Sequence, residues 1–337
     1  MKELTFSRYQ RLAIRLRIAG SPDRAAFARD GVQSRAFRQT FIAIAMNPMC
    51  TNRETKSNVD EETLSNAGGT KALSATVPGT DQITIRKCAG MEELEACVAL
   101  QKEVWNFDDV DLVPLRMFIV SQKIGGQTIG AFQGGELVGF AFSIPGSRAG
   151  HAYLHSHMLA VRDSFRNHGL GRKLKLAQRE DAIQQGIELL EWTFDPLEIK
   201  NAHLNLSRLG AIARRYSVNH YGHSSSPLQG GLPTDRLVAE WWLNSRRVVN
   251  LLEKKQPPQF RVEKRIEVPA QIYAWKSSPD DRQKAADVQK RNREQFLSAF
   301  PNGLVALGYE RDAQENGAFL LGRWDETWSY ASTEDDE

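Results

Sequence analysis

The chain has 337 residues, of which 41% are hydrophobic and 25% charged, and its formal net charge is +3 at pH 7. These proportions are typical of a globular protein with a sizeable core, and they exclude fibrous, collagen-like and wholly disordered material. The charge is too small for this length to indicate nucleic-acid binding, and no basic run is interleaved with aromatic residues. We therefore expect no nucleic-acid partner.

Cysteine use and hydropathy bear on the cellular compartment. The three cysteines, Cys50, Cys88 and Cys97, form none of the close pairs that zinc sites and redox motifs need. No apolar run is long enough to span a bilayer, and the N-terminus lacks the uninterrupted apolar stretch of a secretory signal. The sequence favours a soluble cytoplasmic protein without a membrane partner.

The first eighty residues differ from the rest of the chain. Eight arginines occur within the first forty residues, and residues 58–82 are rich in Ser, Thr, Asn, Gly and Glu. We predict a poorly ordered N-terminal segment and linker over residues 1–80. Alternatively, residues 5–19 could form a basic amphipathic helix for a membrane surface or an organelle transit signal.

From residue 83 onward, regular apolar periodicity predicts an α/β domain over residues 81–245. In chain order we expect a strand at 83–87, helices over 91–105 and after Pro114, strands at 128–132, 137–144 and 151–161, a helix over 172–185, a strand at 187–194, a helix over 201–214 and a strand at 237–243. Gly134-Gly135 is a hairpin signal, so the sheet should be mixed.

After residue 245 the signals weaken. A helix over 245–255, a further strand, a charged helix over 280–300 and a hairpin over 304–324 predict a packed α/β extension. We assign residues 246–337 to this extension, which could be a fragment of a second, similar unit. Its acidic end, residues 334–337, is most simply a solvated tail.

The most informative stretch is the loop 166–171, between the strand ending at Val161 and the next helix. Gly169 and Gly171 permit positive φ angles and close backbone approach, so main-chain amides can converge on an anion beside the positive end of the helix dipole. Basic side chains cluster there, namely Arg166, His168, Arg172 and Lys173. The arrangement favours a diphosphate, although Gly-x-Gly alone equally fits a tight structural turn.

The loop resembles that of the GNAT superfamily of acyl-CoA N-acyltransferases, in which Arg-x-x-Gly-x-Gly binds acyl-CoA. The element order over residues 83–243 also matches, about half of the chain. The resemblance implies a GNAT fold with a mixed, mostly antiparallel sheet splayed at the acyl-CoA site, acetyl-CoA or another acyl-CoA as co-substrate, and no metal. By this resemblance the cofactor-binding residues are Leu159, Ala160, Val161, Arg166, Asn167, His168, Gly169, Leu170, Gly171, Arg172 and Asn201, the last of which could equally be a helix N-cap.

Two histidines precede the loop. His155 and His157 are two residues apart in a strand, so their side chains should share one face. An alkyl amine is protonated at pH 7 and needs a base before it can attack a thioester, and imidazole titrates in the right range. The stretch resembles arylalkylamine N-acetyltransferases, in which His-x-His-x-Leu-Ala-Val precedes the glycine loop and the histidines form a water-linked base. Hydrogen-bonded core residues or metal ligands are the alternatives.

The acid for the departing thiolate is harder to assign. Many GNAT enzymes carry a tyrosine on the fourth helix, where this chain has Leu206. Tyr216 and Tyr221 lie just beyond, and we assign the role to Tyr216, with core packing as the alternative. Glu191 could hold an ammonium group or assist the histidines. A backbone N–H at a bulge near Leu159 should stabilise the oxyanion.

The sequence thus predicts an acyl-CoA-dependent N-acyltransferase, by preference an N-acetyltransferase, acting on a small amine or amino acid by direct attack on the thioester. Other blocks resemble a prokaryotic predicted-acetyltransferase subfamily, which names no substrate. The alternatives are an N-succinyltransferase of amino acids, a non-catalytic acyl-CoA-binding module, and a protein-modifying enzyme with a broad groove. The assembly could be a homodimer.

Overall fold

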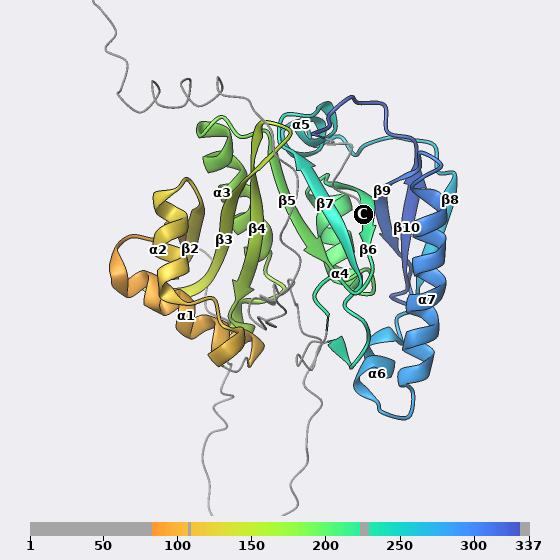
Figure 1. The fold of residues 1–337 in the computed structure, drawn as a ribbon, viewed down its shortest axis with the longest axis horizontal. Coiled ribbons are helices and arrows are strands. Elements are labelled where there is room, and N and C mark those ends of the chain that lie inside the picture. Colours follow the sequence, from red (N-terminus) through yellow and green to blue (C-terminus); the bar gives the residue numbers. More distant parts are fainter. Residues whose placement is uncertain (1–82, 107–108, 223–228, 331–337) are drawn as a thin grey trace, which may run out of the picture. The chain divides into compact units, whose positions relative to one another are not determined.

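The computed structural model describes residues 83–330 apart from 107–108 and 223–228, and these residues share one large sheet (Figure 1). Its ten strands run in the order β1-β2-β3-β4-β5-β7-β6-β9-β10-β8. Among the described strands the pairing of β4 with β5 is parallel and the others are antiparallel. The fold is therefore the mixed, mostly antiparallel α/β class predicted. The expected helix at 5–19, the linker and the acidic tail lie outside the described residues.

The elements follow the predicted order in the first part of the chain. They are β1 (Ile83–Lys87), α1 (Gly90–Trp105), η2 (Asp109–Asp111), α2 (Leu115–Lys123), β2 (Gln127–Gln133), β3 (Glu136–Arg148), β4 (His151–Val161), η3 (Asp163–Phe165), α3 (Leu170–Gln184), β5 (Leu189–Phe194), α4 (Ile199–Ala202), the π-helical turn η4 (His203–Arg208), β6 (Ile212–Ser217) and β7 (Arg236–Trp242). The extension adds α5 (Arg246–Leu252), β8 (Lys264–Val268), α6 (Ile272–Ser277), α7 (Arg282–Ala299), β9 (Val305–Arg311) and β10 (Gly317–Gly322).

One predicted helix was wrong at its C-terminal end. The helix expected over 201–214 ends at Arg208, and residues 212–217 form β6 instead. Gly210 takes a φ of +80°, a left-handed conformation that stops a helix and that glycine adopts without strain. The strand that follows pairs with β7 and, at Ala213, with β9. This unpredicted strand is what joins the extension to the main sheet.

The extension repeats the element order of the domain's start without repeating its topology. After α5, the extension has a strand, two helices and two further strands, and the domain starts with the same series. At the start of the domain, however, β1 pairs with β2, whereas in the extension β8 pairs with β10. The extension therefore continues the sheet with a different connection, and it is not a second copy of the first unit.

Helices cover both faces of the first half of the sheet. On one face, α1 and α2, orange to yellow in Figure 1, pack Phe118 against Phe140 and Phe142 of β3. On the other face, α3 packs Leu174 in a separate cluster that contains Trp192 of β5. Among the described helices, none combines the length and the apolar character needed to cross a bilayer.

A buried ion cluster ties the extension to the turn after β5. The ammonium of Lys276 on α6 lies 2.9 Å from both the Asp195 and the Glu198 carboxylate, and its side chain is 5% exposed. Asp195 also accepts a hydrogen bond from the backbone N–H of Leu197 at 2.8 Å. Without the lysine, the two buried carboxylates would lose their ion-pair partner and be left with only the more weakly acting charge of Arg236.

We predict that Lys276→Met lowers the free energy of unfolding by about 3–5 kcal/mol, because it strands buried carboxylates. Lys284→Met is the matched control, since Lys284 pairs with Asp281 while 61% exposed. We expect the control to cost less than about 1 kcal/mol. Urea titration followed by tryptophan fluorescence would measure both, and equal losses would contradict the assignment.

Candidate functional site

The loop before α3 is shaped by one glycine and one asparagine. Gly169 has a φ of +76° and is the N-cap of α3, and Asn167 has a φ of +63°. Gly171, by contrast, is helical and has no positive φ, so of the two glycines only Gly169 takes the conformation that both would permit. A Cβ at Gly171 would lie 3.5 Å from Leu159 Cδ2. Gly169 therefore provides the turn, and Gly171 keeps the approach to the helix start open.

A cavity of about 290 Å³ opens at this helix start. Seven of the predicted cofactor residues line it, namely Val161, Arg166, Asn167, Gly169, Leu170, Gly171 and Arg172. Five of its lining side chains are cationic and none is acidic: Arg166, Arg172, Lys200, Arg208 and Arg311. Main-chain amides at a helix N-terminus, surrounded by cations, form a site for a phosphate or diphosphate.

Some predicted cofactor residues lie outside this cavity, and some lining residues were missed. Leu159 and Ala160 are buried in β4, Asn201 is buried on α4, and His168 is exposed beside the cavity's loop. Arg311 comes from β9 in the extension, and no local signal in the sequence ties it to the loop.

Close to the loop, β4 and β5 part. They pair only at Leu154 with Leu190 and at His155 with Glu191, and no pairing follows. In the partner strand β3, Phe142 faces Met158 and Ser143 faces Ser156, so His157 is an extra, bulged residue. A bulge redirects consecutive backbone groups and twists its strand. It lies two residues before the predicted position at Leu159.

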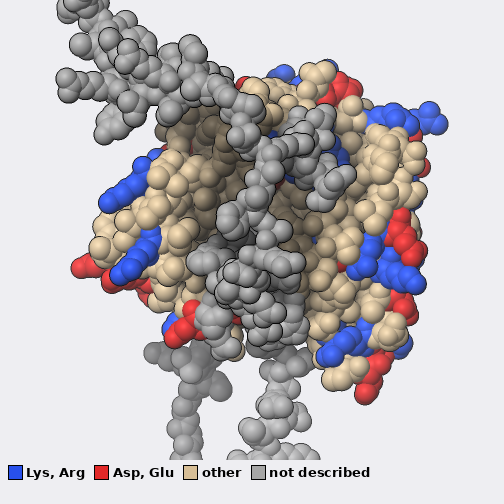
Figure 2. Space-filling model, viewed as in Figure 1, with Lys and Arg blue, Asp and Glu red and all other residues tan. Residues whose placement is uncertain are grey.

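Viewed as in Figure 1, the surface is hollowed over β4, β5 and β7, between the flank of α1 and α2 and the flank of the extension (Figure 2). His155 and His157 lie on β4, with their ring centroids 6.2 Å apart. The ring of His157 also lies 6.2 Å from that of Phe142, on the α1 and α2 side of the sheet. The two histidines therefore share a face, as alternation predicted.

Both imidazoles are neutral at pH 7. Burial lowers the pKa of His155 to about 4, with the charge of Glu191 acting in the opposite direction. Burial also lowers the pKa of His157 to about 3, and neighbouring His155 adds to the effect. Neutral imidazoles can accept a proton. The described residues contain no group of three or more His, Cys, Asp or Glu side chains placed to hold a metal.

Glu191 is held in an ion network beside His155. Arg148 donates to its two oxygens at 2.8 and 3.1 Å, and Arg215 forms a further ion pair with it. Arg215 also bonds Glu240 of β7 at 3.1 Å, which Arg214 contacts at 2.7 Å. Burial alone would raise the pKa of Glu191, but Arg148 and Arg215 lower it below its ordinary value. Glu191 is thus a paired carboxylate without a free oxygen for a proton.

In this network the acids are covered and the cations are accessible. The Glu191 and Glu240 side chains are 6% and 3% exposed, whereas those of the three arginines are 18–29% exposed. With three positive and two negative groups, the network has a positive excess. The surface next to His155 is therefore cationic.

The two candidate tyrosines occupy different places. Tyr216 lies on β6, which β5 and β7 separate from β4. Its hydroxyl donates to Asp235 at 2.7 Å and its ring stacks on Phe296 of α7, so its contacts are those of core packing. The hydroxyl of Tyr221 lies 2.6 Å from Thr193 Oγ1 on β5, beyond the point where β4 and β5 part. Of the two, Tyr221 lies at the strand that borders the gap.

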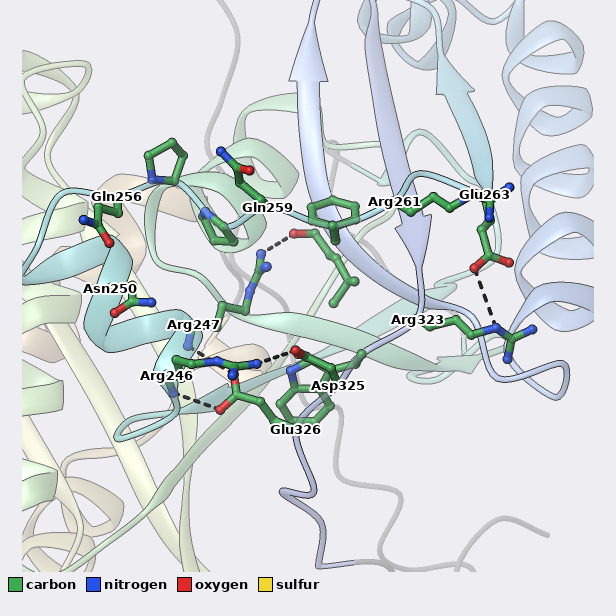
Figure 3. Close-up of a pocket in the computed structure, with 15 residues that line it drawn as sticks. Arg246, Arg247, Asn250, Gln256, Gln259, Arg261, Glu263, Arg323, Asp325 and Glu326 are labelled. Carbon is green, nitrogen blue, oxygen red and sulfur yellow. Dashed lines mark hydrogen bonds and ion pairs between the residues drawn. The ribbon is translucent and has the colours of Figure 1, made fainter.

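A larger cavity, of about 690 Å³, lies in the extension and shares no lining residue with the loop cavity (Figure 3). Its charged groups are engaged mainly with protein partners. Arg246 pairs with Asp325, Arg323 lies 3.6 Å from Glu263, and the guanidinium of Arg247 donates to the Gly210 carbonyl at 2.9 Å. The cavity at α3 is consequently the better candidate for an anionic co-substrate.

Comparison with known proteins supports this reading of the fold. The model of the acetyltransferase (GNAT) family matches residues 92–208, about a third of the chain. Similar solved structures include the ribosomal-protein-S18-alanine N-acetyltransferase of Escherichia coli (16% identity, 48% of this chain and 95% of that chain, TM-score 0.40). A GNAT acetyltransferase of Elizabethkingia anophelis with acetyl-CoA bound is another (15%, 48% and 99%, TM-score 0.37).

A third, from Streptococcus pneumoniae, is an acetyltransferase of the GNAT family (19% identity, 47% of this chain and 98% of that chain, TM-score 0.39). These similarities are too distant to transfer substrates or residue roles. No curated protein matches the chain. The family match itself contains β4, the glycine loop and α3, the elements that build the cavity. Residues 92–208 are therefore identified, by this match, as a GNAT acetyltransferase domain.

Proposed function

We propose that this chain is an acyl-CoA-dependent N-acyltransferase that moves an acetyl group onto the amine of a small molecule. The observation that carries the proposal is the cationic cavity at the start of α3, next to the strand on which two neutral histidines stand. Between the anion site and the histidines, the edge of β4 that faces β5 is unpaired, because β5 does not pair with β4 beyond His155. A chain of amides and a thioester fits that path.

Each part of the site would have one task. The amides at the start of α3 and the surrounding cations hold the diphosphate of the co-substrate. The unpaired edge of β4 hydrogen bonds the amides of the pantetheine arm as an added strand would. Amides at the His157 bulge stabilise the oxyanion, while His155 and His157 accept the proton of the attacking amine, directly or through water.

The cationic surface beside His155 favours an acceptor that carries a carboxylate. An isolated ammonium group gains nothing from exposed guanidiniums, whereas a carboxylate can form charge-assisted hydrogen bonds with them. An amino acid therefore fits better than a simple amine. The same surface would suit the terminal carboxylate of a succinyl donor, so acetyl-CoA and succinyl-CoA should be compared directly. A silent acyl-CoA-binding module remains the rival, motivated by Leu206 where many relatives carry tyrosine.

The loop assignment predicts that Gly171→Glu weakens coenzyme A binding at least about tenfold, because a carboxylate would project into a diphosphate site. Gly171→Ala is the matched control. Its added Cβ would make only an ordinary contact with Leu159 at 3.5 Å, so binding should stay near wild type. Isothermal titration calorimetry with coenzyme A would test both. If the glutamate variant bound coenzyme A as tightly as wild type, the loop would not be the diphosphate site.

The base assignment predicts that His155→Gln/His157→Gln lowers kcat by about 10²-fold or more while coenzyme A binding persists. Because burial lowers both pKa values, the wild-type pair stays neutral until the pH falls through about 4. The acid limb of kcat/KM for acetyl-CoA should therefore lie below pH 5, not near 6.5, and should vanish in the variant.

His151→Gln is the control for the histidine variant, because His151 lies on the same strand but is exposed. It should leave the profile unchanged. Two results together would support the non-catalytic binding module over the enzyme. The double variant would bind coenzyme A and lose only stability, and the wild-type protein would acylate no amine.

The acceptor proposal predicts that an amino acid is acylated about ten to a hundred times more efficiently than the amine left when its carboxylate is removed. Phenylalanine and phenethylamine form such a pair. Mass spectrometry of products from acetyl-CoA and succinyl-CoA, followed by kcat/KM for each acceptor, would decide. A preference for the decarboxylated amine would exclude carboxylate recognition.

A further inference from the structure

A lysine amine lies in the core directly behind the point where β4 and β5 part. Lys175 is on α3 and is 0% exposed. Its Nζ donates to Ser156 Oγ at 2.7 Å and lies 3.6 Å from the ring centroid of Trp192. Ser156 and Trp192 immediately follow His155 and Glu191, the last pair between the two strands. The amine therefore sits under the first residues of the gap.

No described carboxylate forms an ion pair with this amine. Its charge is held instead by the hydroxyl of Ser156 and the face of Trp192, two weak partners. The hydroxyl of Ser156 donates a hydrogen bond to Gln178 Oε1 at 3.0 Å, so its oxygen lone pairs can accept one from the lysine. A structural core position would be filled at less cost by an apolar residue, because burying a charge without a counter-ion is unfavourable.

The reaction lacks an acid at this position. When the amine attacks the thioester, the carbon–sulfur bond breaks and the electron pair stays on sulfur. Tyr216 donates its hydroxyl hydrogen bond to Asp235, and it lies on β6, which β5 and β7 separate from β4. If a co-substrate lies along β4 from the loop, its sulfur would be placed beside Ser156, five residues before Val161. That is about 17 Å along the strand.

We propose that Lys175 is the general acid for the departing thiolate, a role that rests on the proposed acyl transfer. As the new carbon–nitrogen bond forms, the proton of the attacking amine passes to the histidine pair. One N–H bond of the Lys175 ammonium breaks as its proton moves to the sulfur, which leaves a neutral lysine and a free thiol. Before the next turnover the histidine pair releases its proton to solvent and the lysine takes one up, which restores both groups.

The surroundings of the amine suit this chemistry. Burial lowers the pKa of Lys175 well below its ordinary value, so its ammonium gives up a proton more readily than that of an exposed lysine. A catalytic acid works best when its pKa is near the working pH. On β4 the hydroxyl of Ser156 accepts its hydrogen bond, on β5 the neutral ring of Trp192 faces it, and its charge adds to the effect of burial in lowering the pKa of His155.

The test compares Lys175→Met with Ser156→Ala and Tyr221→Phe on the full chain, using acetyl-CoA and its selenoester analogue. A selenol is more acidic than a thiol and leaves without an acid. We expect Lys175→Met to lower kcat with acetyl-CoA about 10²–10³-fold, with the coenzyme A dissociation constant within about threefold, and to recover most of the loss with the selenoester. Ser156→Ala and Tyr221→Phe should stay within about fivefold of wild type.

Recovery with the better leaving group cannot come from repaired folding, so a partly destabilised Lys175→Met still gives an answer. If that variant does not fold, Lys175→Gln is measured in the same way. The inference is overturned if the loss is equal for both donors, if Ser156→Ala loses as much, or if Tyr221→Phe carries the loss. Absence of acyl transfer by wild type would instead overturn the proposed function.

Discussion

The site depends on a single structural event, the parting of β4 and β5 after His155 pairs with Glu191. In a continuous sheet the backbone groups beyond this point would bond to each other, and no extended ligand could reach them. The bulge at His157 accompanies the parting, because an extra residue twists its strand away from the regular register. The unpaired edge of β4, the amides redirected by the bulge and the two histidines thus lie at one place in the chain.

Buried charge around that place is arranged in two different ways. The histidines are desolvated without strong opposite charge, and so they are neutral and able to accept protons. Glu191 is equally covered but remains ionised, because two guanidiniums compensate its burial. One strand pair therefore carries a neutral base and a fixed anion side by side. The anion holds the guanidiniums of Arg148 and Arg215 in place, and its charge favours the protonated form of His155.

Local patterns in the sequence were sufficient for the loop and the histidines, and insufficient for long-range pairing. The Gly-x-Gly loop and the strand before it are contiguous, so spacing alone predicted their shared location. β6 was missed because Arg214 and Arg215 make its sequence look helical and exposed, while in the fold they pair with acids on neighbouring strands. The contribution of Arg311 depends on β9 lying near α4, a tertiary fact that no short pattern contains.

The extension takes part in the site and is not a separate appendage. Lys276 fixes the turn after β5 through its ion pairs with Asp195 and Glu198. Arg311 adds charge to the anion cavity, and Tyr309 holds the π-helical turn through hydrogen bonds with Ser207 at 2.7 and 2.9 Å. The residues that line the cavity therefore come from both sides of β6 in the chain. Because β6 pairs with β7 on one edge and β9 on the other, any shift of the extension would be transmitted through the sheet to β5. The extension and the two strands that border the gap therefore belong to one continuous sheet.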